Sequence, residues 1–371
     1  MIMSIDIETK SSVDLTKCGV YTYSEDKDFQ ILLLAYAFDD EEVSVIDLSN
    51  GQQLPSRIKQ ALLNPKITKY AFNANFERVC LSKYLNTNLD IKSFKCTQAM
   101  ALRLGLSHSL QSVCEILNLD TQKDKEGKAL IKYFNTHNHS DDIIKWEKFK
   151  NYCKTDCIVE RNIRKKLQRY KTTDFEEKVY ILDQKINDKG VKIDTKLIDN
   201  AINLNIYNEK ILKEKLKNLT QIDNIKSPTQ VKKYLKEKHN IEMNSLSKEN
   251  VEKLIKSTNN KDLKEILLLR QSLNKTSIKK YEAMKRTSTK HNSIKGLFQY
   301  YGANKTGRWS GRLVQVQNLP QTNLKNIDLI RNILKENDVK DSFELLEILY
   351  DNTQNVLSNL IRTAFIPTHN K

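Results

Sequence analysis

The sequence of 371 residues contains no apolar run long enough to cross a bilayer. Its clearest apolar run, residues 31–38, has a length that is typical of a buried strand. The N-terminus leads directly into a strand-like segment, without the charged start and apolar core of a signal peptide. Internal repeats and low-complexity linkers are also absent. These absences exclude a membrane-spanning chain and a repeat architecture, and they predict a cytoplasmic protein with no membrane partner.

Cysteine is confined to the first 160 residues, at positions 18, 80, 96, 114, 153 and 157. Because no signal peptide precedes them, we expect these side chains to be reduced thiols. Cys153 and Cys157 lie at helical spacing, with His137 and His139 a short distance before them in the sequence. That spacing matches no common zinc pattern, so we do not expect a zinc site.

Negative charge is outweighed by positive charge, with 46 Asp and Glu against 62 Lys and Arg. The formal charge of +16 favours a polyanionic partner, because Lys and Arg neutralise phosphates and release counterions. A Lys-rich surface encoded by an AT-rich genome would give the same excess, so charge alone leaves both readings open. The apolar fraction of 39%, with 15 Tyr and 11 Phe, is sufficient for folded cores. The length favours two or three domains.

The first part of the chain alternates between strand-like and helix-like patterns. Strands are predicted over residues 2–7, 30–38, 43–48 and 67–72, and helices over 110–117 and 143–167. This alternation predicts an α/β domain with a mixed sheet. The strand signal then fades, and helices are predicted over residues 175–187, 195–218, 228–239, 248–257 and 261–286.

The last of these predicted helices carries a run of basic residues, among them Arg270, Lys275, Lys279 and Lys280. A basic run of this kind is often a solvated face. In this chain the overall positive charge favours contact with phosphates.

Four carboxylates in three short clusters have the layout of a two-metal nuclease site. Asp6 and Glu8 are two residues apart in a strand-like segment, so both side chains leave the same face. Glu77 lies in the segment FNANFER, and Tyr152 and Asp156 are four residues apart on one face of a helix. Converging carboxylates repel one another, and their burial is costly. Two divalent cations, Mg²⁺ or Mn²⁺, would remove that penalty, because both prefer oxygen ligands.

Glycine is scarce, with nine in the chain, yet three of them lie at positions 302, 307 and 311. Glycines at this density let the backbone approach another surface closely. The same stretch supplies donors suited to phosphates, sugars and groove edges, from Arg308, Arg312, Gln315, Gln317 and Asn318. An ordinary surface hairpin is the alternative, and the clustering argues against it.

These segments resemble parts of one enzyme family. GANKTGRWSGRLVQVQNLP resembles the template–primer motif of family A (DNA polymerase I-like) DNA polymerases, in the form found in bacteriophage enzymes. DIE, NANFE and YCKTD resemble the three exonuclease motifs of the proofreading domain of that family, the DEDD class with a tyrosine. CTQAMALRLGLSHSLQSVCEILNL resembles the connecting segment of that domain, and SPTQVKKYL and RQSLNKTSIKKYEAM resemble the thumb. The resemblance covers essentially the whole chain.

The resemblance implies two domains and a location in the bacterial host cell. Residues 1–172 would form a ribonuclease H-like α/β domain with 3′–5′ exonuclease activity. Residues 173–371 would form a mainly helical, incomplete polymerase domain with the thumb, the template–primer motif and the start of the palm. The expected partners are DNA single-stranded 3′ ends and template–primer DNA.

The resemblance also implies a role for each residue of the carboxylate clusters. Asp6, Glu8 and Asp156 would hold the metal that activates the attacking water, and Asp6 would bridge to a second metal at the leaving 3′ oxygen. Tyr152 would orient the water through its hydroxyl. The products would be nucleoside monophosphates, and single-stranded or frayed ends would be preferred.

The sequence departs from the family pattern in two places. Glu77 stands where the second exonuclease motif more generally carries Asp, and we keep it as a metal ligand. The closing segment LIRTAFIPTHNK resembles the lead-in to the first palm motif, without the palm carboxylates or the fingers helix. We therefore expect exonuclease activity from this chain but no polymerisation by it alone.

Two alternatives stay open. The first is a DNA-binding subunit with little activity of its own, completed by a separate C-terminal polymerase chain. The second is an RNA 3′ exonuclease of the ribonuclease D type, which shares the acidic pattern but does not account for residues 300–320.

Overall fold

The computed structural model describes residues 1–119, 126–303 and 305–368. The chain divides into two compact units, each made of two segments. Unit 1 comprises Met1–Val191 and Arg286–Gln317, and unit 2 comprises Lys192–Lys285 and Asn318–Lys371. The second segment of unit 1 is far along the sequence, yet it belongs to the same compact unit as the carboxylate clusters. The domain boundary between residues 172 and 173 stays a prediction.

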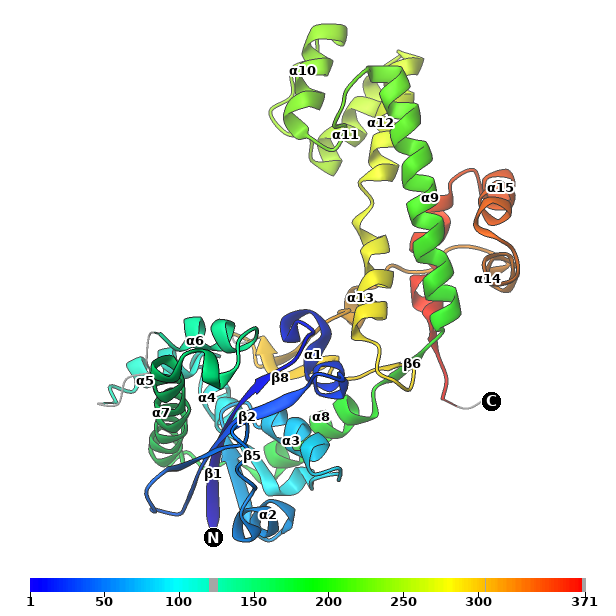
Figure 1. Cartoon of the computed structure of the whole chain (residues 1–371). Coiled ribbons are helices and arrows are strands. Elements are labelled where there is room, and N and C mark those ends of the chain that lie inside the picture. The colour runs from blue at the N-terminus through cyan, green and yellow to red at the C-terminus, as the bar shows by residue number, and fades with distance from the viewer. Residues whose placement is uncertain (120–125, 304, 369–371) are drawn as a thin grey trace. The chain divides into compact units, whose positions relative to one another are not determined.

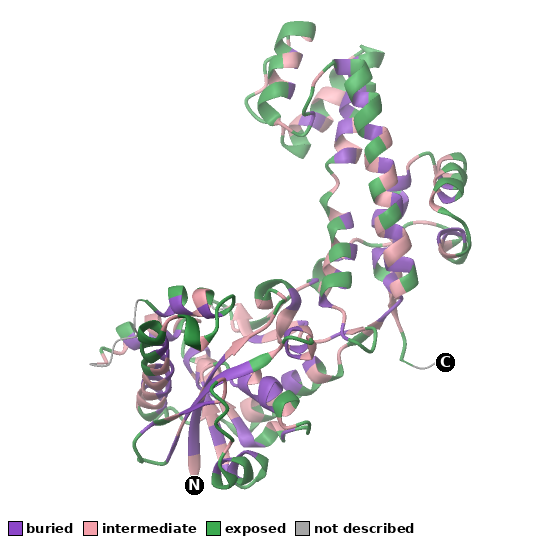
Figure 2. Cartoon of the chain, in the orientation of Figure 1, coloured by how far each residue is buried: buried purple, intermediate pink, exposed green. Residues whose placement is uncertain are grey.

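Unit 1 is built around a mixed five-stranded sheet with the strand order β3-β2-β1-β4-β5 (Figure 1). Its strands are β1 (Ile2–Lys10), β2 (Gln30–Phe38), β3 (Ser44–Asp47), β4 (Thr68–Ala71) and β5 (Phe94–Cys96). β1 pairs antiparallel with β2 and parallel with β4, so the prediction of a mixed sheet is confirmed. Figure 2 shows that β1 and β2 are largely buried, as expected for strands at the centre of a sheet.

The two faces of the sheet have separate hydrophobic cores, because side chains alternate along each strand. Met3, Ile5 and Ile7 of β1 pack on one face with residues of α2 (Ser56–Leu63) and α3 (Asn75–Tyr84). Leu33 and Ala35 of β2 pack on the other face with residues of α6 (Gly127–Phe134) and α7 (Ile143–Leu167). The alternation therefore turns the even-numbered residues of β1 toward the α7 face.

The remaining helices of unit 1 are α1 (Leu15–Glu25), α4 (Thr97–Arg103), α5 (Leu110–Ile116) and α8 (Asp174–Lys189). The predictions of helices over 110–117, 143–167 and 175–187 agree with α5, α7 and α8 to within two residues at each end. The helices α1, α2, α4 and α6 were not predicted from the sequence. The later segment of unit 1 adds β7 (Ser293–Ile294) and an antiparallel hairpin of β8 (Phe298–Ala303) and β9 (Arg308–Gly311).

Unit 2 is mainly helical. It contains α9 (Thr195–Thr220), α10 (Pro228–His239), α11 (Lys248–Ser257), α12 (Lys261–Leu273), α14 (Ile327–Glu336), α15 (Val339–Tyr350) and α16 (Thr353–Leu360). The helices α9 to α12 share one hydrophobic core, and α14, α15 and α16 pack against α9. The strand β6 (Val191–Ile193) pairs antiparallel with β10 (Phe365–Ile366) through Ile193 and Lys192.

The prediction of one continuous helix over 261–286 is wrong. The structure has α12, a 3₁₀ turn (Thr276–Ile278) and then α13 (Lys279–Thr287). Asn274 ends α12, and Lys275 adopts an extended backbone with φ −68° and ψ 103°. The break falls in the sequence NKTS, where Asn, Thr and Ser are weak helix formers. No helix of the described residues is both long and apolar enough to cross a membrane.

Candidate functional site

The strand β1 places Asp6 and Glu8 on the face of the sheet that α7 covers. Asp6 lies opposite Ala35 of β2, and Glu8 lies opposite Leu33. Glu8 is only 8% exposed, while Asp6 is half-buried. The Cys153 thiol of α7 lies 3.6 Å from the Oδ2 atom of Asp6, which shows how closely α7 packs against this strand.

The helix α7 presents Tyr152 and Asp156 to the same region. The helix begins at an Asp142 cap, whose side chain accepts from the backbone N–H of Lys145 at 2.9 Å. Tyr152 and Asp156 are 2% and 5% exposed. Burial raises the pKa of Tyr152, and the negative charges of nearby carboxylates, together with a hydrogen bond to Asp156, raise it further. The tyrosine hydroxyl therefore keeps its proton and remains a hydrogen-bond donor.

Glu77 joins this cluster from the first turn of α3. Its carboxylate is 4% exposed, and its Oε2 atom is buried without a hydrogen-bond partner among the described residues. Burial raises the pKa of the Glu77 carboxyl well above its usual range, and the negative charge of Asp6 raises it further. A buried carboxylate with an unsatisfied oxygen is costly, so its presence here indicates a ligand.

The chemistry of these side chains fits divalent cations. Carboxylate oxygens from Asp6, Glu8, Glu77 and Asp156 are the donors that Mg²⁺ and Mn²⁺ prefer. The orphaned Oε2 atom of Glu77 supports the same conclusion. Within the described ranges, no three His, Cys, Asp or Glu side chains are already arranged to hold a metal ion. The side chains thus share a region without forming a closed ligand cage.

Comparisons with known proteins place this geometry in a family. The 3′–5′ exonuclease family model of DNA polymerase A enzymes matches residues 4–170. The DNA polymerase of Bacillus phage SP02 is 46% identical over 381 residues, covering 99% of this chain and 58% of the phage protein. The chain is therefore similar to DNA polymerases of family A. It carries a 3′–5′ exonuclease domain at its N-terminal side and spans 58% of the length of the phage relative.

A solved structure shows the same overall fold. The POL domain of Pol1 from M. smegmatis, in complex with DNA primer-template and dNTP, matches with a TM-score of 0.58 at 14% sequence identity. The match covers 88% of this chain and 54% of that structure. The mostly helical region after the exonuclease domain therefore has the fold of a Pol I polymerase domain, and the predicted fold class is confirmed.

Glu160 of the exonuclease domain is a buried acid that was not predicted from the sequence. Glu160 lies four residues after Asp156 on α7 and is 1% exposed. It accepts a hydrogen bond from the hydroxyl of Thr97, and burial raises its pKa. Its charge also contributes to the raised pKa of Glu77. The continued spacing of four residues after Tyr152 and Asp156 was the available signal.

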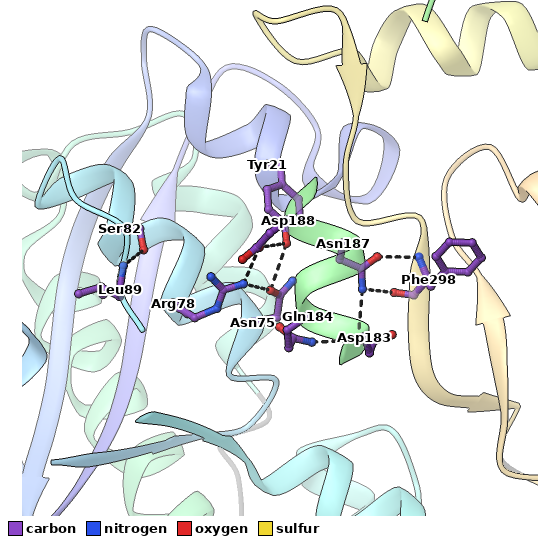
Figure 3. Close-up of polar contacts among 10 residues, drawn as sticks. All are labelled: Tyr21, Asn75, Arg78, Ser82, Leu89, Asp183, Gln184, Asn187, Asp188 and Phe298. Atoms are coloured by element: carbon purple, nitrogen blue, oxygen red, sulfur yellow. Dashed lines mark hydrogen bonds and ion pairs between the residues drawn. The ribbon is translucent and has the colours of Figure 1, made fainter. Parts of the chain in front are cut away.

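A polar network fixes the helix that carries Glu77 (Figure 3). Arg78 donates from Nη2 to Asp188 of α8 at 2.7 Å and to Asn75 at 3.1 Å. The Tyr21 hydroxyl donates to the same Asp188 oxygen at 2.6 Å. Side chains from α1, α3 and α8 thus meet at one carboxylate. Arg78 is 5% exposed, so this network is internal to unit 1.

The same helix α8 also holds the β8–β9 hairpin. The Asn187 side chain donates to the carbonyl of Phe298 at 3.0 Å and accepts from its N–H at 3.0 Å (Figure 3). Asp183 accepts from the indole N–H of Trp309 at 2.7 Å. Because both bonds to Phe298 come from one amide, Asn187 replaces a neighbouring strand for this part of β8.

The predicted DNA-binding residues of the hairpin region are accessible. Arg308, Arg312, Gln315 and Gln317 are exposed in unit 1, and Asn318 is exposed in unit 2. The predicted close approach of glycine backbone occurs within the hairpin itself. A Cβ atom at Gly302 would lie 1.9 Å from the Oγ atom of Ser310.

The predicted basic residues of unit 2 differ among themselves. Lys279 is exposed, and Lys275 and Lys280 are half-buried. Lys275 donates to the side chain of Asn355 at 3.0 Å. Arg270 is 7% exposed, and its Nε atom donates to the carbonyl of Ile225 at 3.3 Å. The structure therefore gives Arg270 a partner within unit 2 rather than an exposed position.

Proposed function

We propose that the chain removes nucleoside monophosphates from DNA 3′ ends by metal-dependent hydrolysis, as the proofreading part of a family A DNA polymerase. One observation carries the proposal. The carboxylates of Asp6, Glu8, Glu77 and Asp156 and the Tyr152 hydroxyl share one buried region of a 3′–5′ exonuclease domain.

Each residue of the cluster has a separate task in this mechanism. Asp6, Glu8 and Asp156 would hold one divalent ion, and Asp6 with Glu77 would support a second. Two bound ions supply an activated water and stabilise the leaving 3′ oxygen. Burial and the nearby negative charges keep the Tyr152 hydroxyl protonated, so it can orient the attacking water. Tyr152 and Asp156 are both buried residues of α7, which keeps the two groups in fixed positions.

DNA is the substrate and partner that we propose, as single-stranded 3′ ends and as template–primer. The formal charge of +16 and the exposed Arg308 and Arg312 support this assignment. The phage relative is a DNA polymerase of greater length, so polymerisation is proposed for the longer assembly that this chain contributes to. If the remaining part of the polymerase domain is encoded by a separate gene, that second polymerase chain would be a partner of this one.

The experiment follows the shortening of a 5′-labelled single-stranded DNA by the full chain. We expect a ladder of products with Mg²⁺ or Mn²⁺, none with EDTA, and a loss of about 1,000-fold or more in Asp6→Ala. Asp40→Asn is the matched control, because Asp40 is an exposed acid that pairs with Lys165. It should retain full activity.

Two outcomes would replace the proposal. Intact DNA with both metals would remove the enzyme assignment, and binding of template–primer without cleavage would favour the DNA-binding subunit. Faster shortening of a matched RNA strand than of DNA would favour the ribonuclease D type of enzyme.

A further inference from the structure

The exonuclease domain and the β8–β9 hairpin enclose a cleft within unit 1. Its volume is about 340 Å³. Asn73, Asn75 and Phe76 line one side, and Gln299 and Arg312 of the hairpin region line the other. The first three residues lie directly before Glu77 in the sequence, so this side of the cleft continues into the helix that carries a proposed metal ligand.

The lining has the chemistry of a site for single-stranded nucleic acid. An aromatic ring such as Phe76 stacks on bases without regard to sequence, and amides such as Asn73 and Asn75 form hydrogen bonds with base edges. The Arg312 guanidinium adds a positive charge that suits a phosphate. A cleft of this volume matches a ligand of small-molecule size, such as a nucleotide, and is too small for a duplex.

One helix, α8, forms hydrogen bonds to both walls of this cleft. Asn187 of α8 makes two hydrogen bonds to Phe298 of β8, and Asp183 accepts from Trp309 of β9. The next residue, Asp188, binds Arg78 of α3 (Figure 3). The helix α8 therefore fixes both the hairpin and the exonuclease helix, so the spacing of the two walls is set before any ligand arrives.

Arg312 is itself held at the cleft. Its Nη2 atom donates to the side chain of Gln299, and the amide of Gln299 lies 3.3 Å from Nδ1 of His108. The guanidinium keeps further donors for a ligand, because an arginine side chain has five N–H groups. Arg312 remains exposed to solvent on its open side.

We propose that the β8–β9 hairpin, beyond its resemblance to a template–primer motif, guides the single-stranded 3′ end toward the exonuclease carboxylates, with Arg312 contacting the phosphate backbone. This proposal rests on the proposed exonuclease function. It gives the segment 286–317 a part in hydrolysis, which agrees with its place in the same compact unit as the carboxylates. A strand that leaves the template would then pass along the hairpin on its way to the cluster.

The test measures steady-state hydrolysis of a 5′-labelled single-stranded oligodeoxynucleotide by the full chain over a range of salt concentrations. We expect Arg312→Gln to raise KM by about tenfold and to change kcat by less than about twofold, because the contact acts in binding. The slope of log(kcat/KM) against log salt should become shallower by about 0.7, the value for one phosphate contact on a single strand. Arg312→Lys should keep most of the salt slope, since it keeps the charge.

Lys59→Gln is the matched control. Lys59 is an exposed cation of α2 that lies outside the β8–β9 hairpin and does not line the cleft, so the KM and salt slope of this variant should equal those of the wild type. A wild type that shortens DNA while Arg312→Gln keeps both its KM and its salt slope would overturn the guiding role alone. A wild type without nuclease activity would instead overturn the proposed function.

Discussion

The buried Arg78 and the partly exposed Asp188 form an ion pair that joins α3 to α8, with Nη2 and Oδ1 2.7 Å apart. The Arg78 side chain is 6% exposed, and Asp188 also accepts from the Tyr21 hydroxyl. Arg78, the residue that follows Glu77, therefore anchors α3, the helix that carries Glu77. Removal of Asp188 would leave a buried cation without its counter-ion, which is among the costliest changes a core can undergo.

We predict that Asp188→Ala lowers the free energy of unfolding by about 3 kcal/mol. Urea unfolding of the full chain measures this change. Asp40→Ala is the control, because Asp40 and Lys165 form an exposed pair, and its loss should cost less than about 1 kcal/mol. Equal costs for the two variants would show that the Arg78–Asp188 pair does not anchor α3.

Glu77 is predicted to lower the free energy of unfolding in the absence of metal and to contribute to metal binding. Its Oε2 atom is buried without a hydrogen-bond partner in the described part of the chain. In EDTA we expect Glu77→Gln to raise the free energy of unfolding by about 1 kcal/mol, since the variant needs neither a buried charge nor a bound proton at this position. Addition of Mg²⁺ should stabilise the wild type more than the variant. Glu42→Gln, at an exposed acid paired with Lys154, should change neither quantity.

Gly127 is predicted to set the position of Tyr152. A Cβ atom at Gly127 would lie 2.0 Å from Cε2 of Tyr152, so one of the two residues must move in Gly127→Ala. We expect a loss of about 1–3 kcal/mol in stability and a fall of about tenfold in exonuclease kcat with little change in KM. In a Tyr152→Leu background the stability cost of Gly127→Ala should be smaller, because the clashing ring is gone. Equal costs in both backgrounds, measured by denaturant unfolding, would contradict this contact.

Local spacing in the sequence predicted most of the candidate site. Asp6 and Glu8 leave one face of β1 because side chains alternate along a strand, and Tyr152 and Asp156 share a face of α7 because a helix repeats every 3.6 residues. Glu77 followed from its place in the resemblance to exonuclease motifs. These features depend on neighbours only a few residues away, which a single sequence displays.

Contacts between distant segments had no such signal. Asn187 and Phe298 are 111 residues apart, and the sequence analysis assigned both to a polymerase domain. Both residues belong to the compact unit that contains the carboxylates. The hydrogen bonds between Asn187 and Phe298 form only because tertiary packing brings this side chain of α8 against β8. Arg270 shows the same limit, because its burial depends on how α12 packs against residues near Ile225.

Asp183 is predicted to make the stability of unit 1 depend on pH. Burial raises the pKa of Asp183 to about 6, and hydrogen bonds from Trp309, Gln184 and Asn187 oppose the shift. Because this pKa lies above the ordinary value of 3.8, the folded state holds the proton more tightly than the unfolded state. The resulting stabilisation is fully present below about pH 4 and is lost as the pH rises through about 6. A shift of about two pH units corresponds to about 3 kcal/mol.

The variant Asp183→Asn tests this dependence, because its amide can still accept from Trp309 but cannot ionise. The free energy of unfolding of the wild type, minus that of the variant, should fall by about 3 kcal/mol between about pH 4 and about pH 7. Asp26→Asn is the control of opposite sign, since hydrogen bonds from Ser12 and Ser11 lower the pKa of Asp26 to about 2. The wild type minus Asp26→Asn difference should rise between about pH 2 and about pH 4 and stay nearly constant from there to about pH 7. A constant difference for Asp183→Asn would mean that the buried carboxylate titrates at its ordinary pKa. Burial would then not raise the pKa of the group that accepts from Trp309 of the hairpin.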